Sequence, residues 1–543
     1  MAKAQGRDIL KKPGSTWMQR VLLVAVLGGA LWLRTAHLAQ PSFHTDEYLH
    51  VLSAQQLIEE GKARLPSGNR YERAKPYTWT VAGSFALFGV SETTARLPSV
   101  LFGTLVVLLT YLVGRRWFGV WPALLAAALV TASPIMVATS RLCRMYSLFQ
   151  LLYLGIVFAY ERSWEQPKRR LRYRALWLVV GGLLLLASAQ IHPLTLVGLV
   201  PSIGVYWAGR AVLGWRSRYS VYLLIAAFLG LIGIASGAIN VDQAWQRLSY
   251  APSWAEGDRH HETLYMKQWA EAYPWIWWVA PVAVPFLLVR HRALGFLVSC
   301  FFLVPFGLHS LLAWKHPRYV SYLFPLLALV VSPLLVWGIR KLGGWVLGAG
   351  ARWRLTLPRW RRYLVATGGG IAVALLVIGA CVQPLTQALA LREEASRPRW
   401  REAYRFLART TRPGEAIVAS IPLAANYYLD RPATHVLNNY LLDFKKKMKR
   451  NAHGLWVDLY SGLPLVTSLA EFRKVRARYA RGWVVVDRGR FRSPRSTPQK
   501  LNRYLVACCQ EHQVVGNGSV RIFRWDETSK EPSRVALGEA GPR

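Results

Sequence analysis

Long apolar runs recur along this chain, and they constrain its fold more than any other feature. A helix needs about 20 apolar residues to cross the hydrocarbon core of a bilayer, which is about 30 Å thick. The runs that we predict to span are 21–39, 97–114, 120–138, 147–161, 175–190, 193–209, 219–238, 275–289, 293–312, 319–339 and 362–383. Over the whole chain, 53% of the residues are hydrophobic. The sequence therefore predicts a polytopic α-helical membrane protein with about eleven transmembrane helices, and it excludes a soluble enzyme.

Basic clusters between these runs predict the orientation of the chain. When the runs are threaded in order, the clusters share one side of the membrane: Arg115 and Arg116, residues 168–174, residues 210–218, residues 290–292 and residues 340–362. Such an excess of Lys and Arg is typical of cytoplasmic loops. We therefore expect an integral protein of a bacterial inner (plasma) membrane with a cytoplasmic N-terminus. The segments expected outside are 40–96, 139–146, 239–274 and everything after residue 384.

Many of the basic residues behind the formal net charge of +40 lie in the same clusters. In a soluble protein this charge would suggest nucleic acid, but here it fixes topology, and we predict no nucleic-acid partner. Each Lys or Arg near anionic head groups contributes about 1 kcal/mol of attraction. Membrane lipids, and substrates that carry a lipid phosphate, are therefore compatible partners.

The segments outside the membrane differ in character. Within 40–96, residues 47–60 and 78–89 are amphipathic and each predicts a helix lying on the membrane surface. After residue 384 the sequence is that of a soluble α/β domain, which we place at 384–525. The chain divides into 1–383 as the transmembrane part, this outer domain, and a polar tail at 526–543.

Short patterns support the α/β assignment. Residues 416–420 and 482–486 predict buried strands, and residues 400–410 and 468–480 predict amphipathic helices. A domain of this size can hold its own core.

Two adjacent carboxylates, Asp46 and Glu47, follow the first apolar run on the outer side, within Phe43-His-Thr-Asp-Glu-Tyr48. Carboxylates at a membrane surface can supply a general base or bind a cation. The alternative is a capped helix, with Thr45 or Asp46 as the N-cap and Glu47 complementing the positive helix end. The residues alone leave both interpretations open.

An ordered series of motifs favours chemistry. The series is His44-Thr-Asp-Glu-Tyr48, Ala74-Lys-Pro-Tyr-Thr-Trp79, residues 87–98, residues 140–148, His192-Pro193 and His316-Pro-Arg-Tyr319. Together these motifs resemble GT-C fold glycosyltransferases, in particular the group of the protein O-mannosyltransferases and the lipid A aminoarabinose transferases. The resemblance covers most of residues 1–340.

The resemblance implies an enzyme that moves a single sugar, a hexose or a pentose, from a polyprenyl-phosphate donor to an acceptor at the outer face, with inversion. It implies Asp46 as the general base or acceptor-positioning residue, with Glu47 beside it. Sugar transfer needs an oriented hydroxyl as an oxocarbenium-like centre develops, so a carboxylate in this place is reasonable. The acceptor is a lipid, a polysaccharide or a protein, and the sequence names neither it nor the sugar.

Further site residues come from the same resemblance. Lys75, Arg318 and Arg144 would meet the donor phosphate, although Lys75 and Arg318 alone would also fit cations at the membrane interface. Candidates for the substrate cavity are His44, Tyr48, Arg141, Tyr146, His192 and Tyr319. The segment 139–146 lacks the second acidic residue of the aminoarabinose transferases. Its arginines, Arg141 and Arg144, either meet phosphate or an acidic acceptor, or pair with Asp46 and Glu47.

The loop 239–274 contains acidic and histidine side chains: Glu256, Asp258, His260, His261 and Glu262. Their spacing matches no compact metal motif, so we predict neither a metal ion nor a cofactor. The loop could also cover the site, with Trp245, Trp254 and Tyr265 stacking on sugar or prenyl groups.

Two other functions are compatible with a polytopic chain. A transporter or flippase of lipid-linked sugars would carry polar or broken spans, often in duplicated halves. The predicted spans are largely uncharged and show no internal repeat. A receptor with an outer sensor domain would explain residues 384–543 but not the ordered motifs, so the sequence favours the glycosyltransferase.

Overall fold

The computed structural model describes residues 13–166, 169–192, 194–214, 261–313, 315–352, 397–429, 431–438, 448–494, 496–526 and 529. The predicted spans 219–238 and 362–383 lie outside the described residues. So do most of the loop 239–274 and nearly all of the polar tail.

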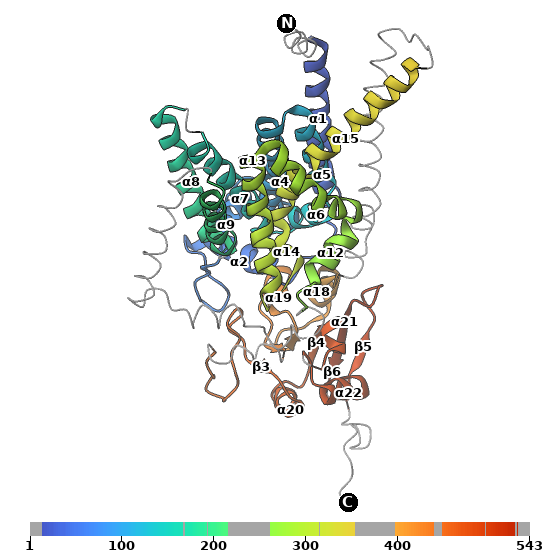
Figure 1. Ribbon diagram of the computed structural model, residues 1–543. Helices are drawn as coiled ribbons and strands as arrows, with labels where there is room; N and C mark the ends of the chain where they lie inside the picture. Colours follow the sequence, from blue (N-terminus) through green and yellow to red (C-terminus); the bar gives the residue numbers. More distant parts are fainter. Residues whose placement is uncertain are drawn as a thin grey trace, which may run out of the picture.

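A bundle of long helices forms the larger part of the molecule (Figure 1). Its members are α1 (Pro13–Thr35), α4 (Glu92–Phe118), α5 (Val120–Ala132), α6 (Pro134–Ser140), α7 (Tyr146–Trp164), α8 (Leu171–Ile191), α9 (Leu194–Val212), α13 (Pro274–Leu311) and α15 (Phe324–Arg352). The helices α12 (Leu264–Ala272) and α14 (Pro317–Val320) and the short turn η3 (Ser321–Leu323) lie toward the end of the bundle that faces the C-terminal sheet. Buried Val, Leu and aromatic side chains fill the space between neighbouring helices.

By length and apolarity, five helices in the described part of the chain could cross a membrane, or six if the bent pair α5 and α6 is one span. The predicted runs 275–289 and 293–312 both lie in α13, which is interrupted at Arg292 by a non-helical backbone conformation. The helices α7 and α9 match predicted runs but are not among the five. The polytopic architecture is therefore confirmed, and the number eleven stays a prediction.

The helices α5 and α6 meet at a bend of 62°, and a buried arginine lies at this bend. Pro134 has no N–H to donate to the carbonyl of Val130. Arg34, which is fully buried, donates to this carbonyl at 3.4 Å, to the Ala30 carbonyl at 3.1 Å and to the Ser140 hydroxyl at 3.3 Å. The guanidinium of α1 thus replaces the backbone donor that the proline removes.

Helices are present at both segments predicted as surface helices, the second beginning three residues earlier than predicted, and their place on the membrane surface stays a prediction. They are α2 (Glu47–Glu60) and α3 (Lys75–Phe88), which pack against each other. On α3, Trp79, Leu87 and Phe88 are exposed while Tyr77 is buried. An exposed aromatic and aliphatic face is typical of a helix that lies in a membrane interface.

The C-terminal part is an α/β unit with one six-stranded sheet. Its elements are α18 (Trp400–Thr410), β1 (Ala416–Ala419), α19 (Pro422–Tyr428), β2 (His435–Leu437), β3 (Leu465–Val466), α20 (Leu469–Arg478), β4 (Gly482–Asp487), α21 (Arg488–Arg492), α22 (Gln499–Cys508), β5 (Gln510–His512) and β6 (Val520–Trp525). The strand order is β3-β2-β1-β4-β6-β5. The strands predicted at 416–420 and 482–486 and the helices predicted at 400–410 and 468–480 are confirmed.

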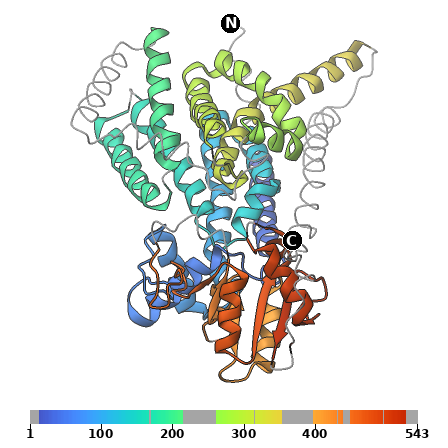
Figure 2. The ribbon, with the colours of Figure 1, turned by 90° about the horizontal axis from the view of Figure 1, so that it is seen from below.

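Three strand pairs are parallel, namely β1 with β2, β1 with β4 and β2 with β3, while β6 is antiparallel to β4 and β5. Every residue of β1 and of β4 is buried, as expected for central strands with helices on both faces. The sheet lies at the end of the bundle opposite the N-terminus, beside the segment that contains α2 and α3 (Figures 1 and 2).

Candidate active site

The segment after α1 is held by arginines from other helices. Arg141, which follows α6, donates to the Leu33 carbonyl at 3.2 Å and also to the Ala36 carbonyl. A cation at a helix C-terminus satisfies carbonyls that have no helical partner. The predicted cavity residue Arg141 therefore makes contacts that fix where the loop after α1 begins.

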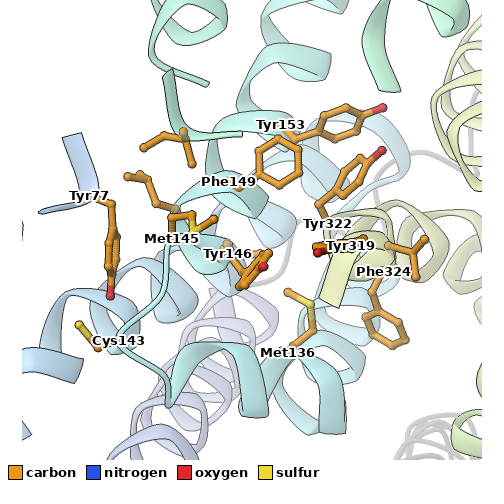
Figure 3. Close-up of a cluster of buried hydrophobic side chains, with 14 of the residues drawn as sticks. Tyr77, Met136, Cys143, Met145, Tyr146, Phe149, Tyr153, Tyr319, Tyr322 and Phe324 are labelled. Carbon is orange, nitrogen blue, oxygen red and sulfur yellow. The ribbon is translucent and has the colours of Figure 1, made fainter. Parts of the chain in front are cut away.

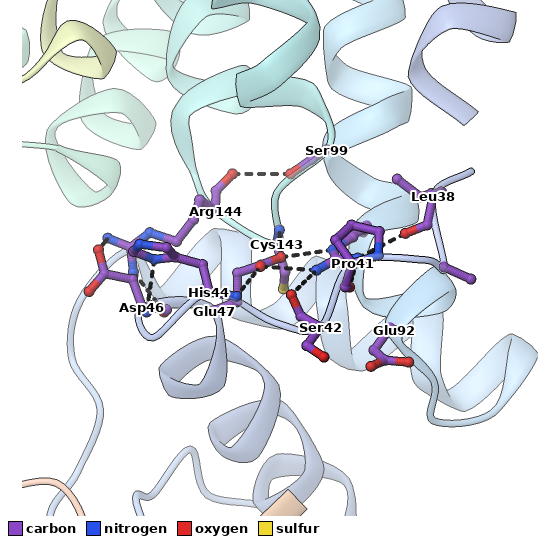
Figure 4. A network of polar contacts seen from close by, with 12 residues as sticks. Leu38, Pro41, Ser42, His44, Asp46, Glu47, Glu92, Ser99, Cys143 and Arg144 are labelled. Carbon is purple, nitrogen blue, oxygen red and sulfur yellow. Dashed lines mark hydrogen bonds and ion pairs between the residues drawn. The ribbon is translucent and has the colours of Figure 1, made fainter. Parts of the chain in front are cut away.

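Glu47 is the centre of a buried ionic network (Figure 4). Arg96 of α4 reaches it with two nitrogens, at 2.9 Å and 3.1 Å, and neither side chain is exposed. The backbone N–H groups of His44 and Cys143 each donate to the same carboxylate at 2.7 Å. Burial would raise the pKa of Glu47, but the contacts with Arg96 outweigh it and lower the pKa. Glu47 is thus an ionised carboxylate enclosed by protein donors.

Arg96 also fixes the backbone that precedes Glu47. It donates to the carbonyls of Leu38 and Pro41 at 2.8 Å and 2.9 Å. Residues 38–47 are therefore tied to α4 at both ends, and the loop presents its remaining carboxylate in one place.

Asp46 faces outward beside two arginines. Its carboxylate lies 3.1 Å from Arg318 and 3.5 Å from Arg144, and its side chain is 31% exposed. Arg144 also donates to the Asp46 carbonyl at 3.0 Å. The structure thus brings together three predicted site residues from the segment after α1, the 139–146 segment and α14.

The charge around Asp46 decides its protonation. Burial would raise the pKa of its carboxyl, but Arg144 and Arg318 outweigh burial, with smaller effects from His44 and Arg73, and hold the pKa well below its usual range. Asp46 is therefore ionised at any physiological pH. The arginines leave the surroundings of Asp46 positively charged as a whole.

Aromatic side chains lie beside the Arg318 guanidinium, and two of them, Tyr146 and Tyr319, belong to a cluster of buried side chains (Figure 3). The Arg318 guanidinium lies 5.4 Å from the ring centroid of Tyr146 and 5.7 Å from that of Tyr319. His192 lies 5.9 Å from Tyr319 and 6.1 Å from Tyr146, between ring centroids. Burial, with nearby Arg73 and Arg144, lowers the pKa of His192 to about 3, so this ring is neutral.

Lys75 and Tyr48 have surroundings other than the Asp46 site, whereas His44 lies beside Asp46. Lys75, at the start of α3, forms an exposed ion pair with Glu72. Tyr48 is fully buried against Phe43 and the C-terminal unit's Tyr427 and Tyr428, so it packs where the two parts of the molecule meet. His44 accepts from the Asp46 N–H at 3.3 Å through its Nδ1 atom.

The motifs did not point to Arg73. This arginine is exposed, and its positive charge helps to lower the pKa of Asp46 and of His192. It precedes Ala74, whose φ of 50° is unusual for a residue with a Cβ atom. Such a conformation is maintained only where the surrounding structure requires it. Ala74 is the residue directly before α3, and no signal in the sequence marks an alanine for a left-handed conformation there.

Within the described ranges, no group of three or more His, Cys, Asp or Glu side chains is placed to bind a metal ion. The loop residues Glu256, Asp258 and His260 lie outside those ranges, as do Trp245 and Trp254. Tyr265 is described, and it contacts the backbone of His316 at 3.0 Å and 3.2 Å, close to Arg318.

Comparisons with known proteins agree with the sequence motifs. Residues 75–239 match the family described as dolichyl-phosphate-mannose-protein mannosyltransferase. No curated protein matches the sequence.

Solved structures match over nearly the whole chain. ArnT from Cupriavidus metallidurans, in a crystal structure bound to undecaprenyl phosphate, is 16% identical and has a TM-score of 0.62, with 96% of this chain and 100% of that chain covered. The oligosaccharyltransferase AglB from Archaeoglobus fulgidus, in complex with an inhibitory peptide and a dolichol-phosphate, is 10% identical, with a TM-score of 0.57 and coverage of 88% and 70%. The chain therefore has the GT-C fold that these glycosyltransferases share, as its motifs predicted.

Proposed function

We propose that this protein is a membrane glycosyltransferase that moves a single sugar from a polyprenyl-phosphate donor to an acceptor at the outer face, with inversion. The observation that carries the proposal is the ionised carboxylate of Asp46, which lies between Arg144 and Arg318 and close to several aromatic rings. A carboxylate can orient a hydroxyl, guanidinium groups bind phosphate, and rings pack on sugar or prenyl groups.

The donor phosphate is proposed to meet Arg144, Arg318 and Arg73. Arginine forms paired hydrogen bonds with phosphate oxygens, and these bonds stabilise the charge that grows on the leaving group. The matched ArnT structure holds undecaprenyl phosphate and the matched AglB structure holds a dolichol-phosphate, which supports a donor of this class. Lys75 would leave its ion pair with Glu72 and bind the donor phosphate instead.

The reaction follows from this placement. An oxygen of the acceptor bonds to the anomeric carbon of the sugar, and the bond from that carbon to the phosphate oxygen breaks. The electron pair leaves with the phosphate, and the hydroxyl proton passes to Asp46. Attack opposite the leaving phosphate inverts the configuration.

Donor binding would also activate the base. In the empty site Arg144 and Arg318 keep the pKa of Asp46 low, which makes it a weak base. A phosphate that takes up these guanidinium groups compensates their charge, so the pKa of Asp46 rises only when a donor is present. Asp46 is thus the proposed catalytic residue, whereas Glu47 is a positioning residue that fixes the loop through Arg96.

The arrangement in the cell follows the sequence predictions. We infer residues 1–383 as the transmembrane transferase, residues 384–525 as an outer α/β domain and residues 526–543 as a tail. The N-terminus would be cytoplasmic and the α/β domain periplasmic or extracellular. The alternative of a flippase is not favoured, because the matched structures include an oligosaccharyltransferase and the family match is to a mannosyltransferase.

The test compares cell-envelope lipids, polysaccharides and proteins by mass spectrometry in cells that carry the wild type or Asp46→Asn. We expect one glycosylated species to disappear in the variant, although the protein still inserts and folds. Glu60→Gln, an exposed position at the end of α2, is the matched control. Product levels that are equal in wild type and Asp46→Asn would overturn the assignment, and retained flipping without transfer in vesicles would favour the flippase.

A further inference from the structure

The strand order of the C-terminal sheet creates a switch point next to the candidate site. From β1 the chain builds outward through β2 and β3 on one side, and it then returns to add β4 on the other side of β1. In open α/β sheets, ligands bind outside the carboxyl ends of the strands at such a point. Here these ends are marked by Ser420, which follows β1, and Asp487, the last residue of β4.

Asp487 organises this edge. Its carboxylate accepts from the Arg490 N–H at 2.9 Å and from the Arg490 guanidinium at 2.7 Å. The Ser420 hydroxyl donates to it at 3.4 Å. Asp487 is almost fully buried, so its charge sets the direction of the Arg490 side chain, of which 20% is exposed.

Arg490 reaches the candidate site from this edge. Its Nη2 atom lies 3.4 Å from the hydroxyl of Thr45, the residue before Asp46. Arg397, from the segment that leads into α18, adds a further positive charge close to Glu47. The Asp46 loop therefore has cationic groups from the C-terminal part of the chain beside it, in addition to Arg144 and Arg318.

Two junctions hold the sheet in this position. At the first, Glu92 at the start of α4 binds Arg401 at 3.0 Å and accepts from the Tyr428 hydroxyl at 2.6 Å. At the second, Ser67 and Asn69 donate to the carbonyl of Leu459 at 2.7 Å and 2.9 Å. One junction lies near the end of the segment 40–96 and the other near its middle, so the sheet is attached to this segment at two separate places.

We propose, on the basis of the proposed function, that the acceptor is anionic and that its carboxylate or phosphate binds Arg490 at the switch point of the C-terminal sheet. The acceptor hydroxyl then lies against Asp46, and the anionic group lies toward the sheet. Arg490 acts as a specificity residue, and Asp487 is the residue that positions it. Arg144 and Arg318 remain available to the donor phosphate.

The experiment uses the full chain in its own cells, with the mass-spectrometric product as readout and with purified protein for binding of undecaprenyl phosphate. We expect Arg490→Gln to lower the product at least tenfold and Arg490→Lys to lower it less. Overexpression of the enzymes that synthesise the acceptor should restore part of the lost product, since the Arg490→Gln change lowers the affinity for the acceptor. Binding of undecaprenyl phosphate should stay at the wild-type level.

Arg492→Gln is the matched control, because it removes the same charge two residues away on α21. A thermal unfolding curve for each purified variant separates a folding defect from an acceptor defect, and Asp487→Asn, which keeps the arginine, should give a smaller loss of product. A product without carboxylate or phosphate would overturn the inference, as would an undiminished product in Arg490→Gln. Absence of any Asp46-dependent product in wild-type cells would instead refute the proposed function.

Discussion

Arg318 lies 3.1 Å from the carboxylate of Asp46, and this ion pair joins the start of the last described membrane helix to the loop after the first. The pair closes the candidate site from two distant parts of the sequence. It also sets the protonation of the proposed base, so it leads directly to a prediction on pH.

Arg318→Gln should shift the acidic limb of the pH–activity profile to higher pH. The pKa of Asp46 is depressed in the native protein, so the carboxylate is lost only when the pH falls through that low value. Removing one guanidinium raises the pKa toward about 3.9, its ordinary value. The measurement is kcat/KM against pH in vesicles. Arg73→Gln is the control and should shift the limb less, because Arg73 has a smaller effect on Asp46. An unchanged limb in Arg318→Gln would contradict this account.

Glu47→Gln should destabilise the protein by about 3–5 kcal/mol, since it leaves a buried charge on Arg96 uncompensated. The fall in thermal unfolding temperature measures this loss. The native pKa of Glu47 is depressed, so its contribution to stability is present above the ordinary pKa of a glutamate and is lost as the pH falls toward the native value. The double variant Glu47→Gln with Arg96→Met should cost less than the sum of the two single changes. Additive losses would show that the pair is not coupled.

Arg34→Met should lower stability, and Pro134→Ala should rescue part of the loss. The methionine leaves the Val130 carbonyl without the Arg34 donor, whereas alanine at 134 supplies a backbone N–H for it. We expect a cost of about 1–3 kcal/mol for a buried acceptor without a donor. Unfolding midpoints of the four proteins of this cycle test the coupling. A Pro134→Ala change that is equally destabilising with and without Arg34 would argue against it.

Glu92→Gln should loosen the junction between the C-terminal sheet and the bundle. It removes a carboxylate that binds Arg401 and Tyr428, and hydrogen bonds to charged groups contribute about 1.5–3 kcal/mol. Faster hydrogen exchange in α18 and α19 would report the loosening. Glu402→Gln, which removes an exposed ion pair with Arg399 on the same helix, should leave exchange in α19 unchanged. Equal exchange rates of α18 and α19 in the two variants would show that Glu92 does not hold this junction.

The sequence predicted the local elements well where one pattern dominates. Residues 47–60 and 75–88 are helical because their apolar residues recur at helical spacing and glycines follow both helices. The buried strands β1 and β4 were equally clear from short apolar runs. The count of spans was harder, since α5 and α6 bend at Pro134 and a non-helical conformation at Arg292 divides α13.

The site was predictable only in part. Motif order pointed to Asp46, Arg144 and Arg318, and the structure brings them together. Both adjacent carboxylates were predicted in the site, with Asp46 as the base and Glu47 beside it, yet the helix directs Glu47 inward to Arg96 and leaves Asp46 partly exposed. Arg490 is separated from Thr45 by 445 positions. No local pattern reports such a contact, because it depends on how the whole C-terminal sheet packs on the loop.

That separation has a consequence for biosynthesis. Ribosomes add about 5–20 residues per second, so Arg490 follows Thr45 by roughly 20–90 s. The bundle helices can insert into the bilayer during this interval, before the loop with Asp46 acquires its contact with the C-terminal sheet. The acceptor side of the site is therefore completed among the last events of maturation, and a chain halted before β4 would be inserted yet inactive.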